Sequence, residues 1–207
     1  MKKRKGPSLP KALRQQSTSY SSPSIVRRAR EYPLLECIIS ADWQNEQPGL
    51  VEIVVARQQP DGNICFGTYL VDKLCLGLKN TFARANYTPA RYQDESRSLF
   101  RDRPFVTCSS TLAYQMIYES IDYASGFGFT PQRDYELTQF MLAPRDEYTP
   151  TYKIHFGQKG NLFGQNKGKP LFISGPDDNV PAILKQLEQT AGPGNYNFIA
   201  MQPLGMF

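Results

Sequence analysis

The densest apolar pattern in the chain spans residues 49–79 and predicts two paired strands. In residues 50–56 the odd-numbered positions are all apolar, and the even-numbered ones are apolar except Glu52. Because both faces are largely apolar, we expect a central strand covered on both sides. Pro60-Asp61-Gly62 has the composition of a tight turn. Residues 64–71 are rich in β-branched and aromatic side chains and should form the returning strand.

Helical periodicity begins after the central strands. Apolar residues recur at spacings of three and four over residues 110–124, which predicts an amphipathic helix. Thr130-Pro131 resembles the cap and first residue of a second helix, which Pro144 would end. We expect this pair to pack as a helical hairpin on one face of the sheet. Pro181 should open a short late helix.

The remaining pattern gives shorter elements. Alternating or continuous apolar residues predict strands at residues 33–40, 152–156, 170–174 and 196–201. Residues 80–85 are expected to form a short helix, and residues 86–104 a long irregular loop. Together these elements predict an α+β fold with a mainly antiparallel sheet.

Charge is distributed unevenly along the 207 residues, whose formal net charge is +5. The first 30 residues contain nine Lys or Arg and no acid, which leaves 15 of the 24 basic residues beside all 19 acidic ones. The nine are Lys2, Lys3, Arg4, Lys5, Lys11, Arg14, Arg27, Arg28 and Arg30. This polar segment cannot bury enough apolar surface to offset the conformational entropy that it would lose on folding. We therefore expect a disordered basic arm over residues 1–31 and a single α+β domain over residues 32–207.

A cationic arm on a mildly acidic domain is typical of proteins that contact phosphate. It predicts a non-enzymatic accessory protein that binds RNA or DNA through the arm, while the folded domain docks on a protein partner. A solubilising terminus would have the same composition. The candidate interface extends into the predicted loop through Arg91, Arg97, Arg101 and Arg103. Tyr87, Tyr92 and Phe100 in the same loop would either stack on bases or anchor the loop to the domain.

Two other functions are compatible with the sequence. Asp42 and Asp72 follow predicted strands, and converging carboxylates at strand ends would suit a metal-dependent nuclease. Strand-end aspartates are also ordinary turn and cap residues. The other alternative is a protein–protein adaptor with no role in nucleic-acid binding.

The cysteines and the single histidine argue against several other chemistries. Cys37, Cys65, Cys75 and Cys108 show no CxxC spacing, and we expect reduced, metal-free thiols in a cytoplasmic protein. His155 shares a predicted solvated strand face with Lys153, so it is expected to be a surface residue and not a catalytic one. We expect no cofactor. No apolar run approaches the roughly 18 residues that span a bilayer, so no membrane partner is expected.

Three stretches carry a resemblance to a family. The segments VAR…LVDKLCLGLK, GFTPQRD and GKPLFISGPDD are similar to a pattern shared by uncharacterised small bacterial proteins. The similarity covers most of residues 49–178 and implies no activity. The matching charged positions are Arg57, Asp72, Lys79, Asp134 and Asp178.

Overall fold

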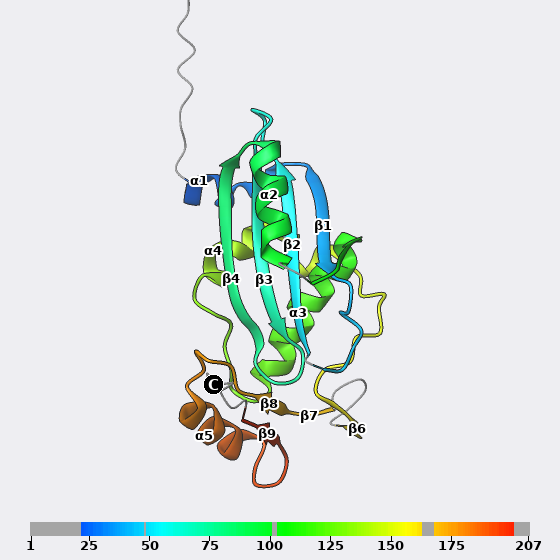
Figure 1. Cartoon of the computed structure of the whole chain (residues 1–207), viewed down its shortest axis with the longest axis vertical. Helices are drawn as coiled ribbons and strands as arrows, with labels where there is room; N and C mark the ends of the chain where they lie inside the picture. The colour runs from blue at the N-terminus through cyan, green and yellow to red at the C-terminus, as the bar shows by residue number, and fades with distance from the viewer. Residues whose placement is uncertain (1–21, 48, 101–102, 163–167, 201–207) are drawn as a thin grey trace, which may run out of the picture.

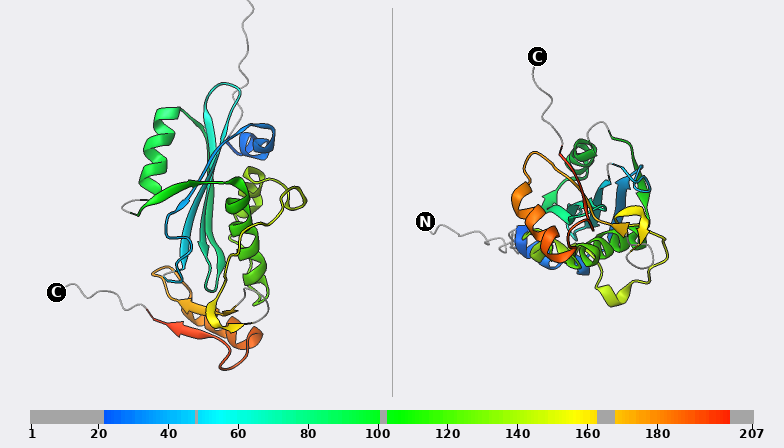
Figure 2. Two further views of the ribbon diagram at one scale, coloured as in Figure 1. Left: turned by 90° about the vertical axis from the view of Figure 1, so that its right-hand side faces the viewer. Right: turned by 90° about the horizontal axis from the view of Figure 1, so that it is seen from below.

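The protein is built around one antiparallel sheet between helices (Figure 1). The computed structural model describes residues 22–47, 49–100, 103–162 and 168–200. Helix α2 (Pro89–Phe100) covers one face of the sheet, and helix α3 (Ser110–Ser125) covers the other, as the edge-on view in Figure 2 shows. The predicted α+β class with a mainly antiparallel sheet is confirmed.

The described part of this sheet has five strands in the order β4-β3-β2-β1-β5. They are β1 (Leu34–Ser40), β2 (Leu50–Gln58), β3 (Ile64–Asp72), β4 (Gly77–Tyr87) and β5 (Phe105–Cys108). The predicted central pair is confirmed, because β2 and β3 pair over their whole length, from Leu50 opposite Asp72 to Gln58 opposite Ile64. Gly62 in their turn has a φ of +84°, which a residue with a side chain rarely adopts.

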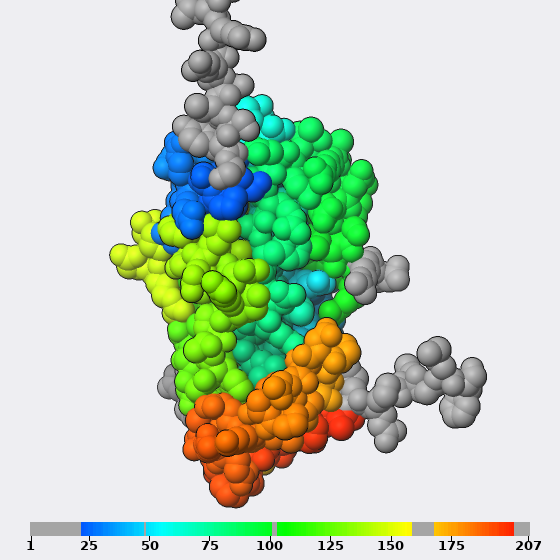
Figure 3. Space-filling view, turned by 90° about the vertical axis from the view of Figure 1, so that its left-hand side faces the viewer, coloured from blue at the N-terminus to red at the C-terminus, as the bar shows by residue number. Residues whose placement is uncertain are grey.

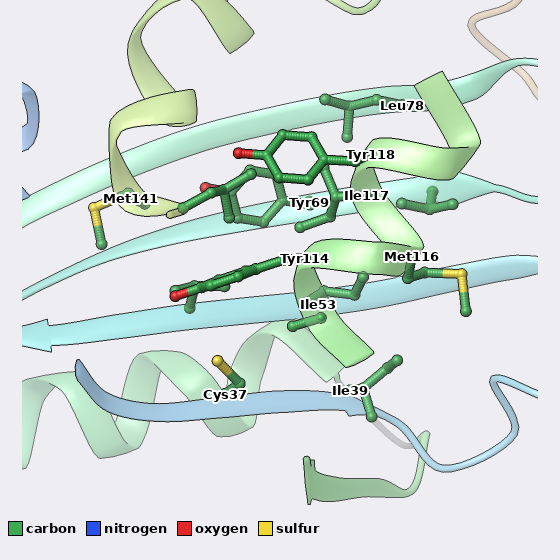
Figure 4. Packing of buried hydrophobic residues seen from close by; sticks show 14 of the residues in the cluster. Cys37, Ile39, Ile53, Tyr69, Leu78, Tyr114, Met116, Ile117, Tyr118 and Met141 are labelled. Atoms are coloured by element: carbon green, nitrogen blue, oxygen red, sulfur yellow. The ribbon is translucent and has the colours of Figure 1, made fainter. Parts of the chain in front are cut away.

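The larger core lies between the sheet and α3 (Figure 4). Ile53 of β2, Tyr69 of β3 and Ile117 of α3 are each at most 1 % exposed. The hydroxyl of Tyr69 donates a hydrogen bond of 2.8 Å to the carbonyl of Thr138, so the polar end of this buried ring is satisfied. The predicted helix over residues 110–124 is confirmed by α3.

A second core lies under α2, where the sequence predicted an irregular loop. Phe66 of the sheet packs against Tyr92 of α2 with a ring-centroid separation of 5.3 Å. Thr88 caps the helix by accepting a hydrogen bond from the backbone N–H of Arg91. The loop prediction was therefore wrong for Pro89–Phe100. The short helix predicted at residues 80–85 was also wrong, because these residues form the middle of β4.

The N-terminal end of the described chain is folded. Helix α1 (Ser22–Arg27) packs beside β4, and together with the 3-10 turn η1 (Ala29–Glu31) it buries Ile25, Val26 and Ala29 in the larger core. Burial of these apolar residues offsets the ordering entropy of the segment. The folded part of the described chain therefore begins at residue 22, ahead of the predicted boundary at residue 32. Residues 1–21 lie outside the described part.

The predicted hairpin partner of α3 is reduced to short turns. Helix α4 (Tyr135–Thr138) has one turn and continues into the 3-10 turn η2 (Gln139–Met141), and a further 3-10 turn, η3 (Arg145–Glu147), follows. The strand predicted at residues 152–156 does not form, although Ile154 and Phe156 are buried.

The last part of the chain forms a small lobe below the sheet (Figure 3). Strands β6 (Gln158–Leu162) and β7 (Gly168–Lys169) pair antiparallel, and β8 (Leu171–Ile173) and β9 (Asn197–Ile199) pair parallel. The predicted late helix is α5 (Val180–Thr190), which buries Leu187 against Phe172. Within the described ranges, none of the helices is long and apolar enough to cross a membrane.

Candidate nucleic-acid interface

The structure describes part of the predicted interface. The predicted cations that lie outside the described residues are Lys2, Lys3, Arg4, Lys5, Lys11, Arg14 and Arg101. Those that it describes are Arg27, Arg28, Arg30, Arg91, Arg97 and Arg103. The second group divides into residues that contact the domain and residues whose charge faces solvent.

Two arginines at the folded root of the arm have intramolecular partners. The guanidinium of Arg28 lies 2.7 Å from the carboxylate of Glu31. Arg30 donates hydrogen bonds to the carbonyls of Leu142 (2.8 Å) and Gln139 (3.1 Å), which fix η1 against the turn after α4. Arg30 therefore contributes to packing at this end of the domain, whereas the Arg28–Glu31 pair is exposed. The neighbouring Arg27 is exposed.

Two exposed arginines lie over aromatic rings near the same end. The guanidinium carbon of Arg91 lies 3.9 Å from the ring centroid of Tyr87, and that of Arg84 lies 4.7 Å from Phe82. Stacking fixes the plane of a guanidinium and leaves N–H groups at its edge for a phosphate. Arg84 was not among the predicted interface cations, because residues 80–85 were expected to form a helix. Figure 1 shows α1 beside the end of β4 from which α2 begins.

The three aromatics considered for base stacking are not available for it. Tyr87, Tyr92 and Phe100 are 6 %, 2 % and 0 % exposed, and they pack between α2 and the sheet. Of the two roles open at the sequence level, the structure therefore supports anchoring.

Arg97 and Arg103 lie apart from this group. Arg97 is exposed in the last turn of α2. Arg103 donates hydrogen bonds of 3.2 Å to the carboxylate of Asp42 and to the carbonyl of Leu50. Since Leu50 and Tyr87 lie at opposite ends of the strands they belong to, the structure does not bring Arg103 to the Arg91 surface.

The carboxylates of the nuclease alternative both have structural contacts. Asp42 pairs with Arg103 at 3.2 Å. Asp72 is 5 % exposed and accepts hydrogen bonds of 2.8–3.3 Å from the backbone N–H groups of Leu74 and the two residues after it. Burial raises the pKa of Asp72 above its ordinary value, although the three donors act to lower it. The part of the chain that the structure describes has no group of three or more His, Cys, Asp or Glu that could hold a metal ion.

The four cysteines are free thiols. Cys37, Cys65 and Cys75 are buried, and Cys108 is partly buried. Burial raises the pKa of Cys37 to about 12 and those of Cys65 and Cys108 to about 11. Such thiols remain protonated at neutral pH and are therefore poor nucleophiles.

The prediction that His155 lies on a solvated strand face was wrong. His155 is partly buried and lines a cavity of about 190 Å³ together with Lys73 and Lys153. Alternating polar and apolar positions placed it on a wet strand face, but no strand forms there.

No protein-family model, curated protein or solved structure matches this chain.

Proposed function

We propose that this protein binds nucleic acid through its basic N-terminal arm. The observation that carries the proposal is the charge of residues 1–30, which contain nine Lys or Arg and no acid. Lysine and arginine side chains neutralise phosphates and release condensed counterions, and this supplies affinity without base recognition. The partner is RNA or DNA, and recognition is of the phosphate backbone.

The folded root of the arm supports this role. Burial of Ile25 and Val26 attaches α1 to the domain beside β4. Exposed Arg27 and the stacked Arg84 and Arg91 add positive charge to the folded domain. A nucleic acid held by the arm would pass over the end of the sheet, where its phosphates would contact these fixed guanidiniums.

The proposal gives the folded domain a second task, which is to dock on a protein partner. Strand β5 pairs with β1 alone among the described strands, so its outer edge offers unpaired backbone groups. Phe105 and Val106 of β5 are 41 % and 45 % exposed, and Leu34 and Leu35 at the start of β1 are 40 % and 44 % exposed. The occupant that fits an apolar sheet edge is an extended strand of the partner.

Deletion of residues 2–21 tests the nucleic-acid role. This deletion removes six cations and leaves α1 intact. Anisotropy of labelled single-stranded RNA and duplex DNA should show that most affinity is lost, while the melting temperature of the domain does not change. A variant whose residues 2–21 are shuffled is the matched control and should retain binding. Unchanged affinity in the deletion variant would contradict the proposal.

The docking role has a separate test. A panel of peptides with alternating apolar side chains is assayed against the wild-type protein and against Val106→Lys. The added charge at the exposed edge should abolish binding of the peptides that the wild-type protein holds. Equal binding by both proteins, or no peptide bound by either, would contradict docking at β5.

A further inference from the structure

Two of the four cysteines lie directly opposite each other in the sheet. Cys37 of β1 is the register partner of Cys108 of β5. Residues directly opposite each other in an antiparallel pair point to the same face of the sheet. Cys37 points from β1 into the core on the α3 side (Figure 4), and Cys108 packs partly buried against that same core. The two thiols are therefore neighbours on the α3 side of the sheet.

The hydrogen-bonding pattern of β1 and β5 sets the separation of the two backbones. The N–H of Ala41 donates to the carbonyl of Pro104 at 2.9 Å. Hydrogen-bonded pairs recur at every second residue of an antiparallel ladder, so Cys37 and Cys108 also form one. The Cα atoms of such a pair lie about 5.5 Å apart. This separation falls within the range of about 4.4–6.8 Å that disulfides span.

A disulfide here requires only a small movement of the edge strand. Cβ atoms of opposite residues lie about 4.5–5.5 Å apart, whereas those of a disulfide lie about 3.5–4.5 Å apart. Strand β5 has four residues and pairs with β1 alone among the described strands, so it can shift towards Cys37. The shift strains the bond, and strained disulfides are reduced more readily. We propose that Cys37 and Cys108 form a reversible disulfide that links β5 to β1.

The oxidant is a small-molecule disulfide such as oxidised glutathione. Cys108 reacts first, because it is partly exposed whereas Cys37 is 2 % exposed. The Cys108 thiolate attacks one sulfur of the oxidant, and one glutathione leaves as a thiolate and takes up a proton. The Cys37 thiolate then attacks the Cys108 sulfur and expels the second glutathione. Two protein thiols and one glutathione disulfide thus give one protein disulfide and two glutathione thiols.

Burial makes this exchange slow at neutral pH. Burial, followed by the proximity of Cys108, raises the pKa of Cys37 to about 12, and burial raises that of Cys108 to about 11. Only the thiolate attacks a disulfide, so the reactive fraction is small. Oxidation should therefore take hours and not seconds, within the range known for disulfide formation. The pair responds to lasting oxidation and not to a brief change.

The other two cysteines provide matched controls. Cys65 of β3 lies opposite Arg57, and Cys75 lies in the turn after β3, against Phe172 of the C-terminal lobe. Both are buried, as Cys37 is. Neither is the register partner of another cysteine in the strand pairs that the structure describes. Replacing either one by serine should leave the disulfide unaffected.

Peptide mapping of the oxidised full-length protein tests the proposal. The folded protein is incubated with glutathione disulfide, quenched with acid, and alkylated after unfolding. Two of its four thiols should be lost, a Cys37–Cys108 linked peptide should appear, and dithiothreitol should restore all four. Cys65→Ser and Cys75→Ser should behave like the wild-type protein, whereas Cys108→Ser should form no intramolecular disulfide. Four thiols remaining in the wild-type protein, or an intramolecular disulfide in Cys108→Ser, would overturn the proposal.

Amide hydrogen exchange shows whether the disulfide forms within the native sheet. Linking β5 to β1 should slow exchange of the β5 amides that face β1, and the rest of the sheet should keep its protection. If oxidation instead speeds exchange throughout the sheet, the bond requires unfolding and the proposal is overturned. Neither measurement involves nucleic acid or a docked peptide. The disulfide and the proposed function can therefore fail independently.

Discussion

Lys79 and Asp178 lie 99 residues apart in the sequence and form an ion pair of 2.7 Å. Lys79 is on β4, and Asp178 precedes α5, so the pair joins the sheet to the C-terminal lobe. The same carboxylate oxygen of Asp178 also accepts a hydrogen bond of 2.7 Å from the N–H of Gly175. The side chain of Asp178 is 8 % exposed, so its charge depends on these partners.

The first prediction is that Asp178→Asn lowers the free energy of unfolding by about 1–3 kcal/mol, the usual cost of removing a charged hydrogen-bond partner at a partly buried site. Urea denaturation measures the change. Lys79→Met and the double variant complete a mutant cycle that isolates the pair from its surroundings. A coupling energy near zero would show that the two side chains do not stabilise each other.

Other charged positions of the family-like pattern also join distant segments. Arg57 is 7 % exposed and donates hydrogen bonds of 2.9 Å to the carbonyls of Met141 and Tyr32. Asp72 holds the turn after β3. Asp134 precedes α4, and its side chain makes no capping hydrogen bond there. For Arg57, Asp72, Lys79 and Asp178, the contacts in this chain are those of structural residues.

The second prediction concerns α1. Ile25→Ala should destabilise the domain by about 2–5 kcal/mol, because Ile25 is 5 % exposed and its truncation leaves a cavity in the larger core. Arg27→Ala, an exposed change in the same helix, should alter stability by at most about 0.5 kcal/mol. Thermal and urea unfolding of both variants check this. Equal stability of Ile25→Ala and the wild-type protein would mean that α1 does not hold to the domain in solution.

The third prediction compares the stability cost of one substitution in each of the two cores. Ile53→Val removes one methylene from the α3 side and should cost about 0.5–1.5 kcal/mol, whereas Phe66→Ala on the α2 side should cost about 3–5 kcal/mol. A domain of this size has about 5–15 kcal/mol of stability, so the second change should lower the melting temperature visibly. If Phe66→Ala cost less than Ile53→Val, the α2 layer would not be packed as described.

The fourth prediction follows from the raised pKa of Asp72. Because burial favours the protonated carboxyl, the folded state binds this proton more tightly than the unfolded state does. The resulting stabilisation is present below the ordinary carboxyl pKa and is lost as pH rises through the raised value. Asp72→Asn removes this dependence, so its stability relative to the wild-type protein should increase as pH rises from about 4 to about 7. Melting curves across this interval measure the difference, and a constant difference would contradict the assignment.

The same Asp72 variant bears on the nuclease alternative. If Asp72→Asn folds but loses a nucleic-acid cleavage activity that depends on a divalent metal, the aspartate is catalytic and the structural account of it is wrong. We expect nucleic-acid binding by this variant to equal that of the wild-type protein, since Asp72 lies at the end of the sheet opposite Arg91.

The central strands could be predicted because their apolar pattern matches the burial of their two faces. Residues 50–56 are apolar on both faces, and both faces are covered in the structure. By contrast, β4 was missed because exposed positions such as Asn80 and Arg84 interrupt its apolar pattern. The strand predicted at residues 152–156 shows the opposite error. Alternation correctly predicted burial of Ile154 and Phe156, but burial does not require a partner strand.

Helix α2 has a signal in its local sequence, whereas the cavity has none. The signal for α2 was local, because Thr88-Pro89 is a cap followed by a proline at the first helical position. The same signal at Thr130-Pro131 was misleading, since α4 begins at Tyr135. The cavity could not be predicted, because Lys73 and His155 line it from segments far apart in the sequence, and no local pattern encodes their proximity.

The fifth prediction is the most direct test of the proposed function. The affinity of the full-length protein for a labelled single-stranded RNA and a labelled duplex DNA is measured across a series of salt concentrations. If about four of the arm's cations contact phosphates, the logarithm of the binding constant should fall against that of the salt concentration with a slope of about −3 to −4. The variant that lacks residues 2–21 should lose most of this slope. A slope near zero for the full-length protein, or the same slope after the deletion, would contradict nucleic-acid binding through the arm.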